Sequence, residues 1–251
     1  MIVRKSQTEI ETMSRAGQVV ARTLALVGEL VRPGVTTSEL DEAAEEHIRS
    51  AGGVPSFKGY RGFPASICTS PNSMVVHGIP GAYRLGEGDL LSVDVGVTLD
   101  GFVADSAYTF AVGEVDTEAK RLLEICQAAL AAGIAEACAG NHVQDISAAV
   151  QRTTEAAGFS VVRSLVGHGI GRSMHEEPQV PNFGEPGRGP LLQPGMTLAI
   201  EPMINAGRPD VWVADDQWSI STDDGSLSAH FEHTVAVTAN GPLVLTKAEA
   251  G

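Results

Sequence analysis

The segment LSVDVGVTLDGFVADSA, residues 91–107, predicts two β-strands joined by an Asp100-Gly101 turn, with an aspartate inside each apolar strand. If the turn has two residues, Asp94 pairs with Ala107, and Asp105 lies on the same face of the hairpin. The two aspartates then occupy diagonal positions, about 7 Å apart between Cα atoms. A three-residue loop would turn Asp105 to the opposite face. The sequence therefore predicts two converging carboxylates, on the condition of a two-residue turn.

The order of the predicted elements, which is helices, strands, helices and strands, indicates an internal duplication. Segments 34–52 and 140–158 have the same length, similar helical patterns and the same terminal Ala-Gly. The motif VVHGIP has a counterpart in VGHGIG, which makes His77 and His168 equivalent. These matches predict an α/β fold with pseudo-twofold symmetry.

The duplication also relates the strand carboxylates. GDLLSVD matches GMTLAIE, which maps Asp94 onto Glu201. By order along the strands Asp105 maps onto Glu232, although the spacing there is not preserved. An alternative is that each aspartate faces solvent in a half-exposed hairpin. Four carboxylates brought together repel one another unless protons or cations neutralise them, and two divalent cations match this charge.

Three of the seven histidines have a setting that suggests function. His168 stands between two glycines and His77 precedes one, which lets the backbone approach a ligand closely, and His175 follows His168 in MHEEPQV. His230 and His233 flank Glu232 and cannot both share its face. For His230, support of a metal ligand and plain packing are both left open.

Composition bounds the class of protein. The chain has 251 residues, of which 43% are hydrophobic and 19% charged, and this predicts one large domain over residues 1–251. With 31 acidic and 17 basic residues, its net charge of −14 disfavours nucleic acid as a partner. Neither a membrane span nor the apolar core of a signal peptide is evident. Cys68, Cys126 and Cys138 are odd in number and widely spaced, so we expect reduced thiols in a cytoplasmic protein, with a monomer as the default.

Five blocks, in register along nearly the whole chain, resemble the methionine aminopeptidases of type I, which have the pita-bread peptidase fold. The blocks are GYRGFPASICTSPNSMVVHGIP, SVDVGVTLDGFVADSA, GHGIGRSMHEEPQV, LAIEPM and SLSAHFEHTVAV. The resemblance implies an α/β (α+β) fold with duplicated helix-helix-strand halves around a curved antiparallel sheet. It also implies that five residues ligate metal: Asp94, Asp105, His168, Glu201 and Glu232.

By this resemblance two divalent ions are bound, with Asp105 and Glu232 bridging them. Oxygen-rich ligation with a single imidazole suits manganese, iron(II), cobalt or zinc, and the identity stays open. The resemblance further implies that Glu201 transfers the proton of an activated water to the leaving nitrogen. His175 would stabilise the oxyanion, and His77 would hydrogen-bond the substrate amide.

An apolar slot for the amino-terminal methionine is the other implied feature. The residues around it would be Tyr60, Phe63, Cys68, Met174 and Trp218. Without the resemblance these residues would count as ordinary packing. Met174 and Phe63 depart from the side chains that are frequent at their positions, and both keep the slot apolar. Gly96 replaces a common threonine, which puts the fine tuning of metal binding in doubt.

The expected activity is removal of the initiator methionine from nascent chains and peptides when the second residue is small and uncharged. Within the same fold, an Xaa-Pro aminopeptidase or dipeptidase is the alternative, and a creatinase-like hydrolase is a weaker one. A binding module that has lost catalysis is the alternative from another class, and the complete ligand set argues against it. Transient docking at ribosomes is left open.

Overall fold

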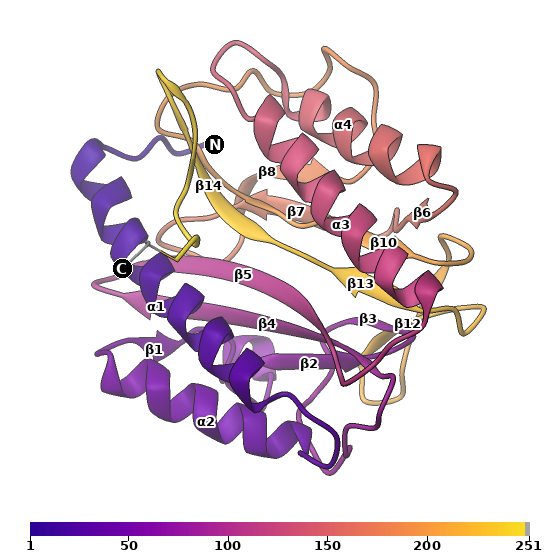
Figure 1. The fold of residues 1–251 in the computed structure, drawn as a ribbon. Helices are drawn as coiled ribbons and strands as arrows, with labels where there is room; N and C mark the ends of the chain where they lie inside the picture. Colours follow the sequence, from indigo (N-terminus) through magenta and orange to yellow (C-terminus); the bar gives the residue numbers. More distant parts are fainter. Residues whose placement is uncertain (249–251) are drawn as a thin grey trace.

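The computed structural model describes residues 1–248 and contains four α-helices with antiparallel strands between and after them (Figure 1). The helices are α1 (Gln7–Leu30), α2 (Thr37–Ser50), α3 (Thr117–Glu136) and α4 (Val143–Ala156), with a 3-10 turn η1 at Tyr60–Gly62. The strands are β1 (Val54–Pro55), β2 (Cys68–Pro71), β3 (Met74–Val76), β4 (Leu90–Leu99), β5 (Phe102–Ala111), β6 (Ser160–Val161), β7 (Val166–Gly169), β8 (Glu176–Pro181), β9 (Thr197–Ile200), β10 (Met203–Asn205), β11 (Val211–Val213), β12 (Ile220–Thr222), β13 (Ser228–His230), β14 (His233–Thr238) and β15 (Gly241–Val244).

Helix starts follow from local hydrogen bonding. Ser6 and Thr36 each accept a hydrogen bond from the backbone of a glutamate three residues on, and that glutamate accepts one from the backbone of the cap. This reciprocal arrangement satisfies amide groups that the first turn of a helix leaves free. No helix among the described residues is both long and apolar enough to cross a membrane.

The β4–β5 hairpin has the predicted register. Asp94 pairs with Ala107, and the turn consists of Asp100 and Gly101, whose φ angles are 50° and 78°. Positive φ at both central residues is the geometry that matches the right-handed twist of the two strands. Asp94 and Asp105 therefore lie on one face at diagonal positions, as the sequence predicts.

The internal duplication is visible in the strand pairing. In the first half Pro55 pairs with Val97, and in the second half Val161 pairs with Ile204 in the corresponding way. Glycines with positive φ recur at matching places, Gly88 before β4 and Gly195 before β9. Each half contributes a pair of helices: Figure 1 shows α1 and α2 along the β4–β5 hairpin and α3 and α4 along the other half. The predicted duplicated α+β architecture is confirmed.

Two residue equivalences predicted from the duplication are wrong in detail. Gly96 and Met203 are counterparts, because they lie at the same separation from the positive-φ glycines Gly88 and Gly195. Gly96 pairs with Asp105, and Met203 pairs with His230. The counterpart of Asp105 is therefore His230, and Glu232 corresponds to Ala107. The order of residues along the strands could not reveal this equivalence, because the strand is interrupted between β13 and β14, where Glu232 lies.

The predicted equivalence of His77 and His168 is also wrong, because the two residues do not occupy corresponding positions in the strand pairing. His168 pairs with Ala199 in β9, and the corresponding residue of β4, Ser92, pairs with Ser70. His77 instead follows β3 with a φ of 60°. The likeness of the two His-Gly motifs thus does not reflect a shared position in the two halves.

A seam of hydrogen bonds joins the halves where β5 meets the segment between β13 and β14. The amide of Glu232 donates to the carbonyl of Ala107 over 3.0 Å. On one side of this bond the hydroxyl of Thr234 accepts from the amide of Asp105 (2.9 Å) and donates to its carbonyl (2.8 Å). On the other side the hydroxyl of Thr109 does the same for His230, over 2.9 and 2.8 Å. The seam is therefore itself close to twofold symmetric.

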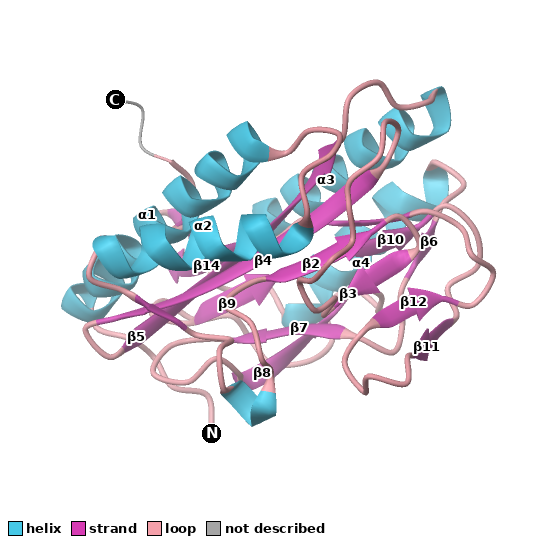
Figure 2. Ribbon diagram, turned by 90° about the horizontal axis from the view of Figure 1, so that it is seen from below, coloured by secondary structure: helices cyan, strands magenta, loops and turns pink. Residues whose placement is uncertain are grey.

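Each half has its own apolar core between helices and strands. Val20 of α1 packs with Val93 and Val95 of β4, and Leu122 of α3 packs with Ile200 of β9. Figure 2 shows the strands of both halves side by side, with α1 and α2 lying along the strands of the first half. This packing holds the strands of the two halves in place on either side of the seam, next to which the acidic side chains lie.

Candidate metal centre and substrate pocket

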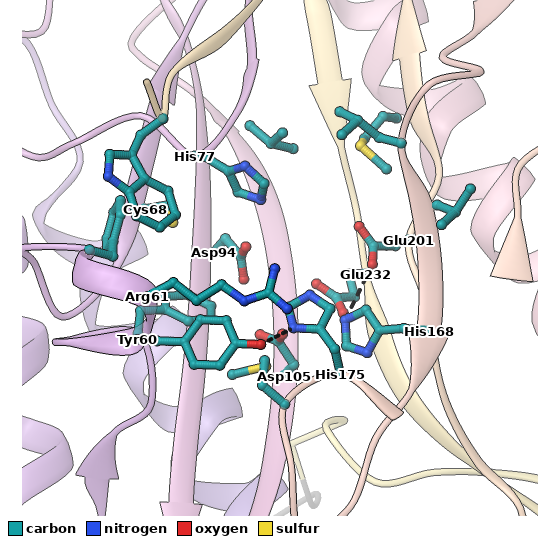
Figure 3. Close-up of a pocket in the computed structure, with 18 of the residues that line it drawn as sticks. Tyr60, Arg61, Cys68, His77, Asp94, Asp105, His168, His175, Glu201 and Glu232 are labelled. Carbon is teal, nitrogen blue, oxygen red and sulfur yellow. Dashed lines mark hydrogen bonds and ion pairs between the residues drawn. The ribbon is translucent and has the colours of Figure 1, made fainter. Parts of the chain in front are cut away.

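One cavity of about 270 Å³ brings together every residue that the sequence singled out for the site (Figure 3). Its lining side chains come from strands and loops of both halves. They include Tyr60, Phe63, Cys68, His77, Asp94, Asp105, His168, Met174, His175, Glu201, Trp218 and Glu232. The individual roles given to these residues stay predictions at this point.

The acidic side chains reach the cavity from two strands and from the ends of two others. Asp94 and Asp105 project from β4 and β5, Glu201 follows β9 and Glu232 precedes β14. Asp105 and Glu232 are only 4% and 2% exposed. Ligand atoms of Asp105, Glu232 and His168 lie within 4.8 Å of one another. This spacing is short enough for the three groups to share an ion.

His168 presents a lone pair to this cluster. Its Nδ1 lies 2.9 Å from the carbonyl of Gly169 and must donate to it, since a carbonyl only accepts. The proton is therefore on Nδ1, and Nε2 is free as an acceptor or metal ligand. That Nε2 lies 3.6 Å from Oε1 of Glu201. Burial lowers the pKa of His168 to about 4, which keeps the ring neutral at physiological pH.

Burial makes the ionised forms of the carboxylates costly. Removal from water raises the pKa of Asp94 to about 7. Burial, reinforced by the charges of the neighbouring carboxylates, raises the pKa values of Asp105, Glu201 and Glu232 well above their usual range. Four groups this close cannot all ionise without compensating positive charge. The cluster accordingly binds either protons or cations.

Unpaired buried oxygens test whether a cation fits. Among residues 1–248, Asp94 Oδ1, Asp105 Oδ1 and Glu232 Oε1 are buried without a hydrogen-bond partner. A buried acceptor without a partner costs free energy, and a hard divalent cation satisfies such oxygens. The donor set of four carboxylates and one imidazole nitrogen therefore fits divalent metal.

Two further histidines stand at the edge of the acidic cluster. The Nδ1 of His175 hydrogen-bonds the hydroxyl of Tyr60 over 2.9 Å, and the two rings stack with centroids 5.6 Å apart. The ring of His175 also lies 4.2 Å from that of His168. His77 points into the cavity from the opposite side (Figure 3), and burial lowers its pKa to about 4. Both rings can act as neutral hydrogen-bond donors.

An apolar cluster forms the other part of the cavity. Phe63 and Trp218 contact edge to face with centroids 5.1 Å apart. Cys68 lies in the same cluster and pairs with Asp94 across β2 and β4. Met174 is 5% exposed and belongs to this cluster too. The predicted substrate-binding side chains are thus gathered within reach of the acidic cluster.

Gly96 and Met174, which both depart from the expected pattern, contact each other. A Cβ atom at Gly96 would lie 2.8 Å from Cε of Met174 and 2.8 Å from Cε1 of Phe57. The missing side chain at Gly96 therefore provides the space that Met174 and Phe57 occupy. The absence of a threonine hydroxyl here shapes the apolar wall of the cavity.

Residues 11–239 match metallopeptidase family M24. The chain belongs to this family.

Relatives within the M24 family resemble this chain along its whole length. A methionine aminopeptidase of Clostridium perfringens is 54% identical over 98% of this chain and 99% of its own. Methionine aminopeptidase 1 of Bacillus subtilis is 47% identical over 98% of this chain and all of its own. The crystal structure of a methionine aminopeptidase from Rickettsia prowazekii superimposes with a TM-score of 0.97 at 40% identity, covering 98% of this chain and all of that one. The resemblance inferred from the motifs and the pita-bread fold are confirmed.

The same cavity is also lined by residues that the sequence analysis did not single out. Phe57 extends the apolar wall, and Arg61 lies at the mouth with its guanidinium 5.3 Å from the centroid of the Tyr60 ring. Arg61 has a φ of 49°, rare for a residue with a side chain. The glycines at 59 and 62 indicate a tight turn there, but no sequence signal gives the direction in which the arginine points.

Proposed function

We propose that this chain removes the amino-terminal methionine from nascent proteins and peptides, preferentially when the second residue is small and uncharged. One observation carries the proposal. Two buried and two partly buried carboxylates converge with His168 in a cavity whose other wall is apolar and contains sulfur and aromatic groups. Such a cavity suits a charged amine and a thioether side chain held side by side.

Divalent metal would be held by the converging residues. In this proposal two ions occupy the set formed by Asp94, Asp105, His168, Glu201 and Glu232. When bound, the ions supply positive charge and Lewis acidity, which acidify a water molecule and polarise a carbonyl. Manganese, cobalt, iron(II) and zinc are all compatible with this donor set. The unpaired oxygens of Asp94, Asp105 and Glu232 support the assignment.

Glu201 is the proposed proton carrier. Its Oε1 faces the imidazole of His168, and burial raises its pKa well above the usual range. A carboxylate that reaches into the cavity beside the activated water can accept a proton there and pass it on. In the proposed reaction it accepts the proton of the attacking water and delivers it to the leaving nitrogen.

The two neutral histidines are assigned to the peptide bond. If the Tyr60 hydroxyl donates to Nδ1 of His175, the proton of that ring lies on Nε2, which is then available to the oxyanion that develops on the carbonyl. His77, on the other side of the cavity, would hydrogen-bond the amide near the leaving group. Both assignments rest on the facing positions of the rings across the acidic cluster.

Methionine selectivity is assigned to the apolar cluster. Phe63, Trp218, Cys68 and Met174 offer aromatic edges and sulfur, which interact favourably with a thioether. Burial raises the pKa of Cys68 well above its ordinary value, so this residue stays a neutral thiol. It therefore acts as a small apolar contact and not as a nucleophile.

A peptide assay tests this function. Purified protein with added manganese or cobalt is expected to release methionine from Met-Ala-Ser, and not to cleave peptides with proline in second position preferentially. Replacing His168 or Glu201 with alanine should abolish turnover. His142→Ala is the matched control, because His142 caps α4 outside the cavity, and it should retain turnover. Absence of methionine release together with cleavage of Xaa-Pro peptides would refute the proposal.

The cellular setting is part of the same proposal. We place the activity in the cytoplasm, in a monomer that acts as a single catalytic domain over residues 1–251. The three cysteines are free thiols, which suits a reducing compartment. Contact with ribosomes would be transient.

A further inference from the structure

His230 is a buried polar residue that the proposed reaction does not use. The side chain is 2% exposed, and its Nε2 has no hydrogen-bond partner within the described part of the chain. The atom lies 3.8 Å from Oε2 of Glu201 and 3.9 Å from Oε2 of Glu232. A buried ring nitrogen without a partner costs free energy, and it here faces two of the acidic residues.

The fold places His230 in the same way as it places Asp105. The two residues are counterparts in the duplicated halves, since they pair with Met203 and Gly96, respectively. Their backbones are held by equivalent threonine hydroxyls across the seam, Thr109 for His230 and Thr234 for Asp105. Each half thus uses this position to direct a side chain toward the acidic cluster. Plain packing does not account for a polar ring in this setting.

The two oxygens of Glu201 face different imidazoles. Oε1 lies 3.6 Å from Nε2 of His168, and Oε2 lies 3.8 Å from Nε2 of His230. Carboxylates that bind a metal through one oxygen are commonly hydrogen-bonded through the other, and such partners increase metal affinity. A distance of 3.8 Å exceeds that of a hydrogen bond, so the two side chains must approach each other to form one.

We infer that His230 is a positioning residue whose Nε2–H donates to the outer oxygens of Glu201 and Glu232, thereby increasing the affinity of the cluster for divalent metal. The inference rests on the proposed metal-dependent function. It assigns to His230 a role through the carboxylates, without contact to substrate or ion.

Metal titration of the apo protein tests the inference. Manganese affinity is measured by isothermal titration calorimetry for the wild type, His230→Leu, His230→Asn and His230→Gln. Loss of the donor in His230→Leu should weaken binding about 10- to 100-fold. The short amide of His230→Asn should weaken it similarly, whereas His230→Gln keeps an N–H donor of greater reach and should stay within about threefold of the wild type. The cobalt absorption spectrum of His230→Gln should match that of the wild type, because His230 does not bind the ion.

The control is His233→Leu. His233 flanks Glu232 on the other side, hydrogen-bonds the hydroxyl of Thr246 over 2.9 Å and does not line the cavity. Its replacement should leave manganese affinity unchanged, while melting curves in chelator show which variants are folded. Wild-type affinity in both His230→Leu and His230→Asn would overturn the inference, and so would a His230→Gln variant that binds as weakly as they do. A wild-type protein that binds no manganese would instead refute the proposed metal site as well.

Discussion

Replacing Asp94 with asparagine is expected to stabilise the metal-free protein while weakening metal binding. Asp94 is partly buried in the cavity wall, and removal from water raises its pKa from 3.8 to about 7. A carboxyl whose pKa is higher in the folded state binds more protons there, so ionisation at neutral pH destabilises the fold. Asparagine has nearly the same shape and cannot ionise, which removes this cost.

The size of the effect follows from the pKa of Asp94. Each tenfold change in proton affinity corresponds to about 1.4 kcal/mol, so a rise from 3.8 to about 7 costs the folded state about 4 kcal/mol above pH 7. The cost develops as the pH rises from about 4 and amounts to about 2 kcal/mol at pH 5. In a chain of this length about 4 kcal/mol corresponds to a rise of about 8–16 °C in Tm. Asp94→Asn should therefore gain about twice as much free energy of unfolding at pH 8 as at pH 5.

The assay is urea denaturation and thermal melting in the presence of a chelator at both pH values. Asp100→Asn is the matched control, because Asp100 lies in the turn of the same hairpin and makes only an exposed ion pair with Arg15. That pair contributes at most about 1 kcal/mol, so the control should change little between pH 5 and pH 8. If Asp94→Asn were no more stable than the wild type at pH 8 in chelator, the argument from buried charge would be wrong.

Three more outcomes follow from the site and the seam. Gly96→Thr should cost about 1–3 kcal/mol by crowding Met174 and Phe57, and a second change of Met174 to alanine should recover part of that in melting experiments; full stability of the single variant would contradict the contact. Thr234→Val leaves the buried amide and carbonyl of Asp105 without partners and should cost about 2–4 kcal/mol by urea denaturation, with a neutral effect refuting the seam. Manganese should raise Tm more at pH 8 than at pH 6, because at pH 6 the ion must displace protons from the carboxyls with raised pKa. A gain independent of pH would contradict proton competition.

The hairpin shows how far sequence reasoning extends. An Asp-Gly pair between two strands specifies a two-residue turn, and the turn specifies the register that brings Asp94 and Asp105 to one face. Local chemistry therefore predicts that part of the site. The same holds for α1 and α2, whose starts are determined by hydrogen bonds between neighbours in sequence.

Long-range register is where the sequence fails. Matching Asp105 with Glu232 by order along the strands overlooks the break between β13 and β14, which places Glu232 two residues beyond the counterpart of Asp105. Matching His77 with His168 by motif fails because His168 pairs with Ala199, whereas the corresponding Ser92 pairs with Ser70. The true counterpart of Asp105, His230, has a different side chain, so similarity between the halves could not reveal it. The contact between Gly96 and Met174 likewise depends on how two distant segments pack.

The position of the acidic cluster at the seam bears on how the two halves unfold. Asp94 and Asp105 belong to one half, whereas His168, Glu201 and Glu232 belong to the other. An ion held by these residues would cross-link two units that are joined at this line by the backbone hydrogen bond from Glu232 to Ala107 and by hydroxyl groups of Thr234, Thr109 and Ser106. We therefore expect metal binding to couple the unfolding of the two halves more tightly, beyond the coupling that the pairing of β3 with β12 already provides.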